Sequence, residues 1–145
     1  MPLSLEYLGG GAFYNAESLT NLELPDSLSY IGGEAFYNAK SLVSINLPYN
    51  LAEVRGSTFE NCESLVSINI PDKVTRIGGH AFYGCKALSD VKISNNSKLE
   101  EIGSSAFRLC DNLYNVTLPQ GVYVNERAFK ESPTIITYYE NYYNY

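Results

Sequence analysis

The chain has 145 residues, of which 45% are apolar and 18% are charged, a composition typical of one folded domain rather than of a disordered chain. Its formal net charge of -6 excludes nucleic acid and anionic membrane surfaces as expected partners, because those are bound by clustered Lys and Arg. No apolar run approaches the roughly 18–20 residues that span a bilayer, so we expect no membrane insertion.

Six phenylalanines divide the chain into repeats. They are separated by 23, 23, 23, 25 and 22 residues, and Ala precedes five of the six. Apolar residues recur in phase, five residues before each Phe and six, nine and eleven residues after it. A fixed period of this length indicates a solenoid, in which each copy buries its apolar face only by stacking on the next. The phenylalanines are Phe13, Phe36, Phe59, Phe82, Phe107 and Phe129.

Each copy contains, in chain order, a strand, a second extended piece and a turn. Segments such as 42–47 alternate apolar and polar residues, which is typical of a half-buried strand. Proline follows most of them and should end the strand, because it donates no amide hydrogen bond. A second extended piece, such as 74–77, leads to glycines whose backbone freedom we expect the turn to use. The Ala–Phe pair then falls in a single helical or 3-10 turn, as in 81–84.

The string Ile-Gly-x-x-Ala-Phe-x-x-Cys-x-x-Leu-x-x-Val-x-Ile-Pro, nearly intact from Ile31 through Leu118, resembles the BspA-type leucine-rich repeat. The likeness covers essentially the whole chain, with two extra residues near Asn95-Asn96 and a different ending after Phe129. It implies an α/β solenoid, a right-handed superhelix of about six 22–25-residue repeats with a parallel sheet on one face and short helical or 3-10 turns on the other. It also implies a surface or secreted binding and adhesion protein without catalytic activity.

The N-terminal segment 2–9 aligns with 25–32, so the first copy lacks its strand. Solenoids need polar end caps, and none is visible here. The chain is then either a piece of a longer array, or its open N-terminal edge is covered by a partner or by self-association with a second copy. No signal-peptide pattern follows Met1. An extracellular or cell-surface location is therefore an expectation from the family resemblance alone.

We expect a single leucine-rich-repeat domain over 1–145, with repeats in 1–134 and a Tyr-rich cap or tail in 135–145. Residues 135–138 have the pattern of a last, shifted strand, and five Tyr lie in 138–145. The aromatic rings could cover the last rung while their hydroxyls face water. The alternative is an adhesive contact patch, since Tyr is enriched in recognition surfaces.

Three cysteines, Cys62, Cys85 and Cys110, each lie three residues after a Phe, where other copies have Ala or Ser. This interchange predicts small, buried free thiols. Because stacked rungs lie about 5 Å apart, a Cys62–Cys85 disulfide is the alternative. No Cys-x-x-Cys occurs and there is one histidine, so we expect no metal site.

No pattern in the chain predicts an active site. The position of His80 is held elsewhere by Gly, Glu, Ser and Arg, which indicates an exposed turn. The glycines do not form a phosphate-binding pattern, and the repeat fixes no pair of carboxylates for acid–base chemistry. We therefore expect neither an enzyme nor a cofactor.

The polar residues that alternate with the buried ones should form two parallel columns on the sheet face. Their short amides and hydroxyls suit hydrogen bonding to a polar ligand, such as a protein loop or a glycan. The alternative is a solvated face whose polar residues prevent aggregation. The candidate partner-binding residues are Asn21, Glu23, Ser44, Asn46, Ser67, Asn69, Asp90, Lys92, Asn115 and Thr117.

Two functions follow from these patterns. The leading one is a non-catalytic binding or adhesion module that presents the sheet face to a protein or glycan. The alternative is a structural building block that self-associates end to end through the uncapped repeat edge and the Tyr-rich tail.

Overall fold

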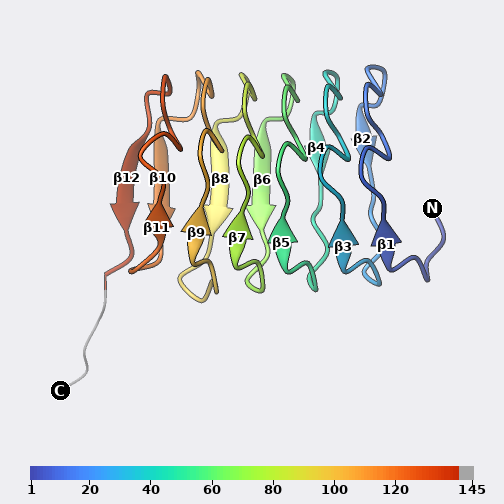
Figure 1. The fold of residues 1–145 in the computed structure, drawn as a ribbon, viewed down its shortest axis with the longest axis horizontal. Coiled ribbons are helices and arrows are strands. Elements are labelled where there is room, and N and C mark those ends of the chain that lie inside the picture. Colours follow the sequence, from blue (N-terminus) through green and yellow to red (C-terminus); the bar gives the residue numbers. More distant parts are fainter. Residues whose placement is uncertain (141–145) are drawn as a thin grey trace.

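The computed structural model describes residues 1–140, which coil into a solenoid whose rungs lie side by side from the N-terminal to the C-terminal repeat (Figure 1). Two rows of short strands run along the coil, and the turns that carry the phenylalanines line one of its edges. Residues 1–140 contain no helix with the length and apolar character needed to cross a membrane.

One row holds the strands expected from the alternating segments, and its outward surface is here called the sheet face. Its neighbours β2–β4, β6–β8 and β10–β12 pair in parallel. In β6 and β8, exposed and buried residues alternate, as predicted. Proline ends β6 and β10 as expected, at Pro71 and Pro119. The strands are β2 (Asn21–Leu22), β4 (Ser44–Ile45), β6 (Ser67–Ile70), β8 (Asp90–Ile93), β10 (Asn115–Leu118) and β12 (Ile135–Tyr138).

The second extended pieces, which the sequence predicts, form another row of parallel strands in addition to the sheet expected on one face. Strand β1 pairs with β3, and β5, β7, β9 and β11 pair in succession. Each strand has only two residues, yet the repeat places them in register from rung to rung. The strands are β1 (Tyr7–Leu8), β3 (Tyr30–Ile31), β5 (Glu53–Val54), β7 (Arg76–Ile77), β9 (Glu101–Ile102) and β11 (Tyr123–Val124).

The Ala–Phe turns are not helical over residues 1–140, which corrects the expected helical or 3-10 face. A helix needs successive amides to bond back along their own segment, but here every second amide bonds to the next rung. Positive φ angles on either side of the phenylalanine also break a right-handed helix, at Glu34 (58°) and Asn38 (57°) in the second copy. In that copy, alternate amides donate within the turn, from Ala35, Tyr37 and Ala39 to the carbonyls of Gly32, Glu34 and Phe36 respectively. The amides between them donate to the next rung, from Glu34, Phe36 and Asn38 to the carbonyls of Gly56, Thr58 and Glu60 respectively.

The six phenylalanines stack on one another along the coil, as the repeat predicts. Neighbouring ring centroids are 5.1–5.3 Å apart and the ring planes lie within 10° of parallel. The four inner rings are fully buried, while Phe13 and Phe129 at the two ends are half-buried. The core is therefore continuous from rung to rung and thins at both ends.

The glycines four residues before a phenylalanine permit close approach of two rungs. A Cβ atom on Gly32 would lie 2.3 Å from the amide nitrogen of Gly10, and one on Gly78 would lie 2.7 Å from that of Gly56. Neither Gly32 nor Gly78 has a positive φ. The prediction that these glycines supply backbone freedom to the turn is therefore wrong at both positions.

The two extra residues of the fourth repeat lie in the loop between β8 and β9. The register of β7 with β9 survives the insertion, and the adjacent phenylalanine rings remain stacked at 5.1 Å. Asp72 holds the loop, because its side chain accepts a hydrogen bond from the hydroxyl of Ser94 (2.6 Å) and its carbonyl accepts one from the amide of Lys98 (2.7 Å). The solenoid therefore absorbs the insertion locally.

Candidate functional site

The sheet face brings the ten predicted residues together in two columns. Strand alternation points them outward, and parallel register aligns them between rungs: Ser67 pairs with Asp90, and Asn69 with Lys92. Nine of the ten are exposed, and Thr117 is half-buried. The residues between them point inward, and four of these five are buried, so the columns are carried by a packed core.

Few interactions within the protein engage the columns. The side-chain oxygen of Asn46 accepts a hydrogen bond from the amide of Leu24 at 3.4 Å. Lys92 and Asp90 form an ion pair at 3.6 Å, and both side chains are at least half exposed. A surface pair of this kind adds little stability, so its two charged groups can exchange water for a ligand at small cost.

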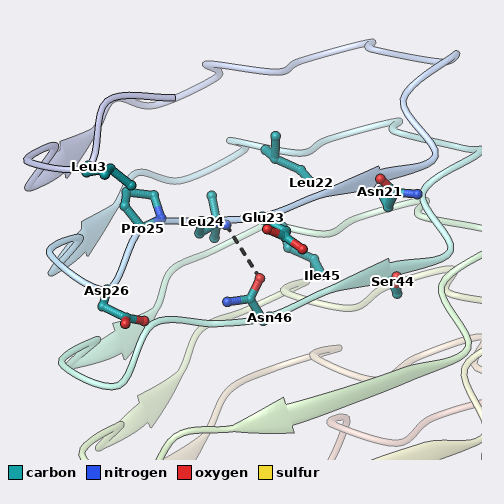
Figure 2. Close-up of a pocket in the computed structure, with 10 residues that line it drawn as sticks. All are labelled: Leu3, Asn21, Leu22, Glu23, Leu24, Pro25, Asp26, Ser44, Ile45 and Asn46. Atoms are coloured by element: carbon teal, nitrogen blue, oxygen red, sulfur yellow. Dashed lines mark hydrogen bonds between the residues drawn. The ribbon is translucent and has the colours of Figure 1, made fainter.

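The face is hollowed at its N-terminal end, between β2 and β4 (Figure 2). Asn21 lies on β2 and Glu23 directly after it, and Ser44 on β4 and Asn46 directly after it lie beside them. Asp26 lies at the rim of the hollow. This N-terminal hollow is acidic, because its lining contains two carboxylates and no basic group.

A second hollow lies at the C-terminal end of the same face and is here called the C-terminal hollow. Five predicted residues line it, together with residues that the sequence analysis did not single out, above all Tyr139. The two hollows thus share one face but differ in charge and in aromatic content. The lining residues are Asn69, Ser89, Asp90, Val91, Lys92, Ile93, Ser94, Asn115, Thr117 and Tyr139.

Tyr139 is fixed in place by the last strand. Strand β12, which confirms the predicted strand at 135–138, pairs with β10 and delivers the following residue to the edge of the sheet face. The Tyr139 hydroxyl donates a hydrogen bond to the carbonyl of Ile93 at 2.6 Å, and the Tyr139 carbonyl accepts one from the side-chain amide of Gln120 at 2.9 Å. The rest of the predicted Tyr-rich tail, residues 141–145, lies outside the described residues.

The opposite row carries a polar column that sequence reasoning missed. Arg76 on β7 bridges the carboxylates of Glu53 (3.0 Å) and Glu101 (3.2 Å) on the neighbouring strands. At the N-terminal end of this column, Tyr7 and Tyr30 stack with their centroids 4.4 Å apart. The signal was present in the sequence, since each of these residues directly precedes the Ile, Leu or Val of its short strand. The charged side chains pair with one another, and a hollow smaller than the two on the sheet face lies beside Tyr30, Glu53 and Arg55.

The three cysteines are buried free thiols, as predicted, and no disulfide joins Cys62 to Cys85. Each thiol donates a hydrogen bond of 3.1–3.2 Å to the carbonyl of the phenylalanine in the preceding rung. Burial raises the pKa of Cys62 and of Cys110 to about 12, and raises that of Cys85 well above its ordinary value. The thiols are therefore protonated and shielded, which makes them poor nucleophiles.

Elsewhere in the described chain, titratable groups do not converge on a cleft. His80 is exposed in its turn, as predicted, with its ring edge-on to Tyr83 at 5.3 Å. Among residues 1–140, no group of three or more His, Cys, Asp or Glu is placed to hold a metal ion. What the geometry offers a ligand is thus polar contact on a rigid surface.

The stacked rungs, the period and the buried aromatic column define the chain as a leucine-rich-repeat solenoid. The family model "BspA type Leucine rich repeat region (6 copies)" matches residues 6–136, and the chain belongs to this family. No curated protein matches the chain.

Solved structures of bacterial leucine-rich-repeat proteins share the fold. A Treponema pallidum leucine-rich repeat protein is 30% identical with a TM-score of 0.73, covering 92% of this chain and 67% of its own. A Eubacterium ventriosum protein is 23% identical with a TM-score of 0.83, covering 99% and 38%. The pneumococcal vaccine antigen PcpA is 26% identical with a TM-score of 0.76, covering 83% and 31%. The chain therefore spans about two thirds of the first protein's structure and less than two fifths of the other two.

Proposed function

We propose that the protein is a non-catalytic binding module whose sheet face contacts a protein or glycan partner. The observation that carries the proposal is the pair of exposed columns of short amides, hydroxyls and charged groups on a close-packed scaffold. Such groups are preorganised, because the buried residues between them hold the strands in register, and preorganisation lowers the entropic cost of binding. The concave hollows add contact area for a ligand.

The same proposal includes a location at the cell surface or outside the cell. One similar protein, PcpA, is named as a vaccine antigen, which supports an accessible location for this chain. We also propose that residues 1–134 are the repeats of one domain and that residues from 135 onward serve as its cap.

The test is a triple substitution on the sheet face with a matched control. Asn46, Asn69 and Lys92 are replaced together by Ala, and binding is measured against a printed panel of glycans and a panel of purified secreted proteins. The control replaces Asn95, Asn96 and Lys98 by Ala, which likewise removes two Asn side chains and one Lys side chain, but from the exposed loop between β8 and β9. The expected result is loss of binding in the first variant only. Binding that survives the first variant would argue against the sheet face.

The alternative proposal, end-to-end self-association, is favoured by one observation at the C-terminal edge. Strand β12 ends its row of strands and its Ile135 side chain is 64% exposed, while Phe129, the last ring of the stack, is half-buried. An apolar edge of this kind can pair with another strand. Sedimentation velocity over a range of concentrations tests it. Assembly should be abolished by Ile135→Lys or by deletion of residues 138–145, whereas a monomer at every concentration contradicts it.

A further inference from the structure

We propose that the C-terminal hollow binds a neutral saccharide residue, such as the terminal sugar of a glycan. The proposal rests on the binding role proposed above for the sheet face and narrows its partner to one chemical class. It also assigns a wall of the site to Tyr139, which lies outside the repeat pattern.

The charge of the hollow fits a neutral ligand. Its lining contains one carboxylate, Asp90, and one ammonium group, Lys92, which lie 3.6 Å apart. The two charges cancel, so neither an anionic nor a cationic ligand is attracted overall. The N-terminal hollow differs, because Glu23 and Asp26 make it acidic and no aromatic residue lines it.

The hydrogen-bonding groups of the hollow fit neighbouring hydroxyls. A hydroxyl both donates and accepts, and adjacent hydroxyls on a sugar ring present two such groups side by side. A carboxylate accepts two hydrogen bonds, and an amide pairs one acceptor with one donor. Asp90, Asn69 and Asn115 supply these groups from three neighbouring strands, and all three side chains are exposed.

Tyr139 supplies the apolar part of the site. Its hydroxyl is committed to the carbonyl of Ile93 at 2.6 Å, so the ring is what it offers to a ligand. Sugar rings carry an apolar face of C–H groups that packs on aromatic rings, which combine a hydrophobic surface with a negative π face. The hydrogen bonds that hold Tyr139 leave little side-chain freedom to be lost on binding.

The experiment is an NMR titration of the full chain with neutral methyl glycosides of glucose, galactose, mannose and N-acetylglucosamine. At least one glycoside should shift the backbone amides of Asp90, Lys92 and Asn115 while leaving those of Asn21 and Glu23 unchanged. Asp90→Ala and Tyr139→Ala should each weaken this binding by about tenfold or more. Tyr139→Phe keeps the ring and should retain most of the affinity.

The matched control is Glu17→Ala, which removes one exposed carboxylate from the turn of the first copy, outside the candidate partner-binding residues, and should leave affinity within about twofold of the unsubstituted protein. Circular dichroism confirms that each variant is folded. The proposal is overturned if no glycoside shifts the residues of the hollow, or if Glu17→Ala weakens binding as much as Asp90→Ala. The proposal is also overturned if a protein partner is found whose binding is abolished by the triple substitution of Asn46, Asn69 and Lys92 but is unchanged by Asp90→Ala and Tyr139→Ala. That result would leave the proposed binding role of the sheet face intact.

Discussion

At the scale of single residues, asparagine holds the second of the two left-handed turn positions in each of the first three copies. Asn15, Asn38 and Asn61 have φ angles of 57–60°, a conformation that Asn tolerates better than most residues. Their side-chain amides hydrogen-bond from rung to rung at 3.0 and 3.1 Å. The ladder ends at Gly84, where a Cβ atom would lie 2.4 Å from the side-chain oxygen of Asn61.

Asn38→Ala should destabilise the protein by about 1–2 kcal/mol, because it removes both amide hydrogen bonds and places a less tolerant residue at positive φ. Urea unfolding followed by circular dichroism measures the change. Asn95→Ala, at an exposed loop position outside the ladder, should cost less than about 0.5 kcal/mol. Equal losses in the two variants would show that the ladder contributes nothing.

Because the thiols are buried, the free energy of unfolding should fall as the pH becomes alkaline. In the unfolded chain they titrate near 9.0, whereas burial raises the pKa of Cys62 and Cys110 to about 12 in the folded protein. The folded state therefore binds more protons between these values, and the stability that the thiols contribute is full below pH 9 and is lost as pH rises toward 12. Each thiol should lower the free energy of unfolding by up to about 1.4 kcal/mol for every pH unit in this window.

The measurement is the free energy of unfolding from pH 8 to pH 11, compared with a variant in which Cys62, Cys85 and Cys110 are all Ala. Ala holds the same position in the first two copies, at Ala16 and Ala39, so the substitution suits the site. The variant should lose stability less steeply over this range, because it lacks the three buried thiols. Parallel curves would mean that the thiols are not the cause.

At the scale of the elements, the strands were predictable and the turns were not. Alternation along 67–70 and 90–93 reports which side of a strand is buried, and that is a local property. The turn depends on hydrogen bonds between rungs, such as that from Phe36 to Thr58, and local pattern contains no information about them. The glycines were misinterpreted for the same reason, because the atom that excludes a Cβ at Gly78 belongs to another rung.

Gly78→Ala should destabilise the protein by roughly 1–3 kcal/mol, because the new methyl group would press on the backbone of the preceding rung. Gly9 holds the same repeat position in the first copy, where a Cβ atom would meet only the Tyr7 side chain at 3.8 Å. Gly9→Ala should therefore change stability by less than about 0.5 kcal/mol. Thermal unfolding of the two variants tests whether the glycine is needed for the close approach of two rungs or for backbone freedom. A similar loss of stability in both variants would contradict the packing explanation.

At the scale of the whole molecule, the stability of a rung depends on its neighbours. Phe82→Ala removes a fully buried ring from the centre of the stack and should cost about 3–5 kcal/mol. Phe13 stacks on one ring only and is half-buried, so Phe13→Ala should cost clearly less. Chemical denaturation of both variants gives the comparison, and equal costs would be inconsistent with a stack that thins at its ends.

The site was predictable as far as the repeat extends. The period alone placed Asn46, Asn69 and Lys92 at equivalent positions on one face, because each rung adds the same strand in the same register. Tyr139 follows the last strand, where the pattern of the earlier copies has ended. Its place at the sheet face depends on the pairing of β12 with β10, which only the three-dimensional structure shows.

The bonds between rungs also determine how the molecule should respond to mechanical force. The hydrogen bonds that join neighbouring turns connect one rung to the next, so they run along the solenoid axis. A pull on the two ends of the chain loads these bonds lengthwise at the terminal rung rather than sharing the load among all rungs. The coil should therefore peel open one repeat at a time, and each 23-residue step should release roughly 80 Å of extended chain.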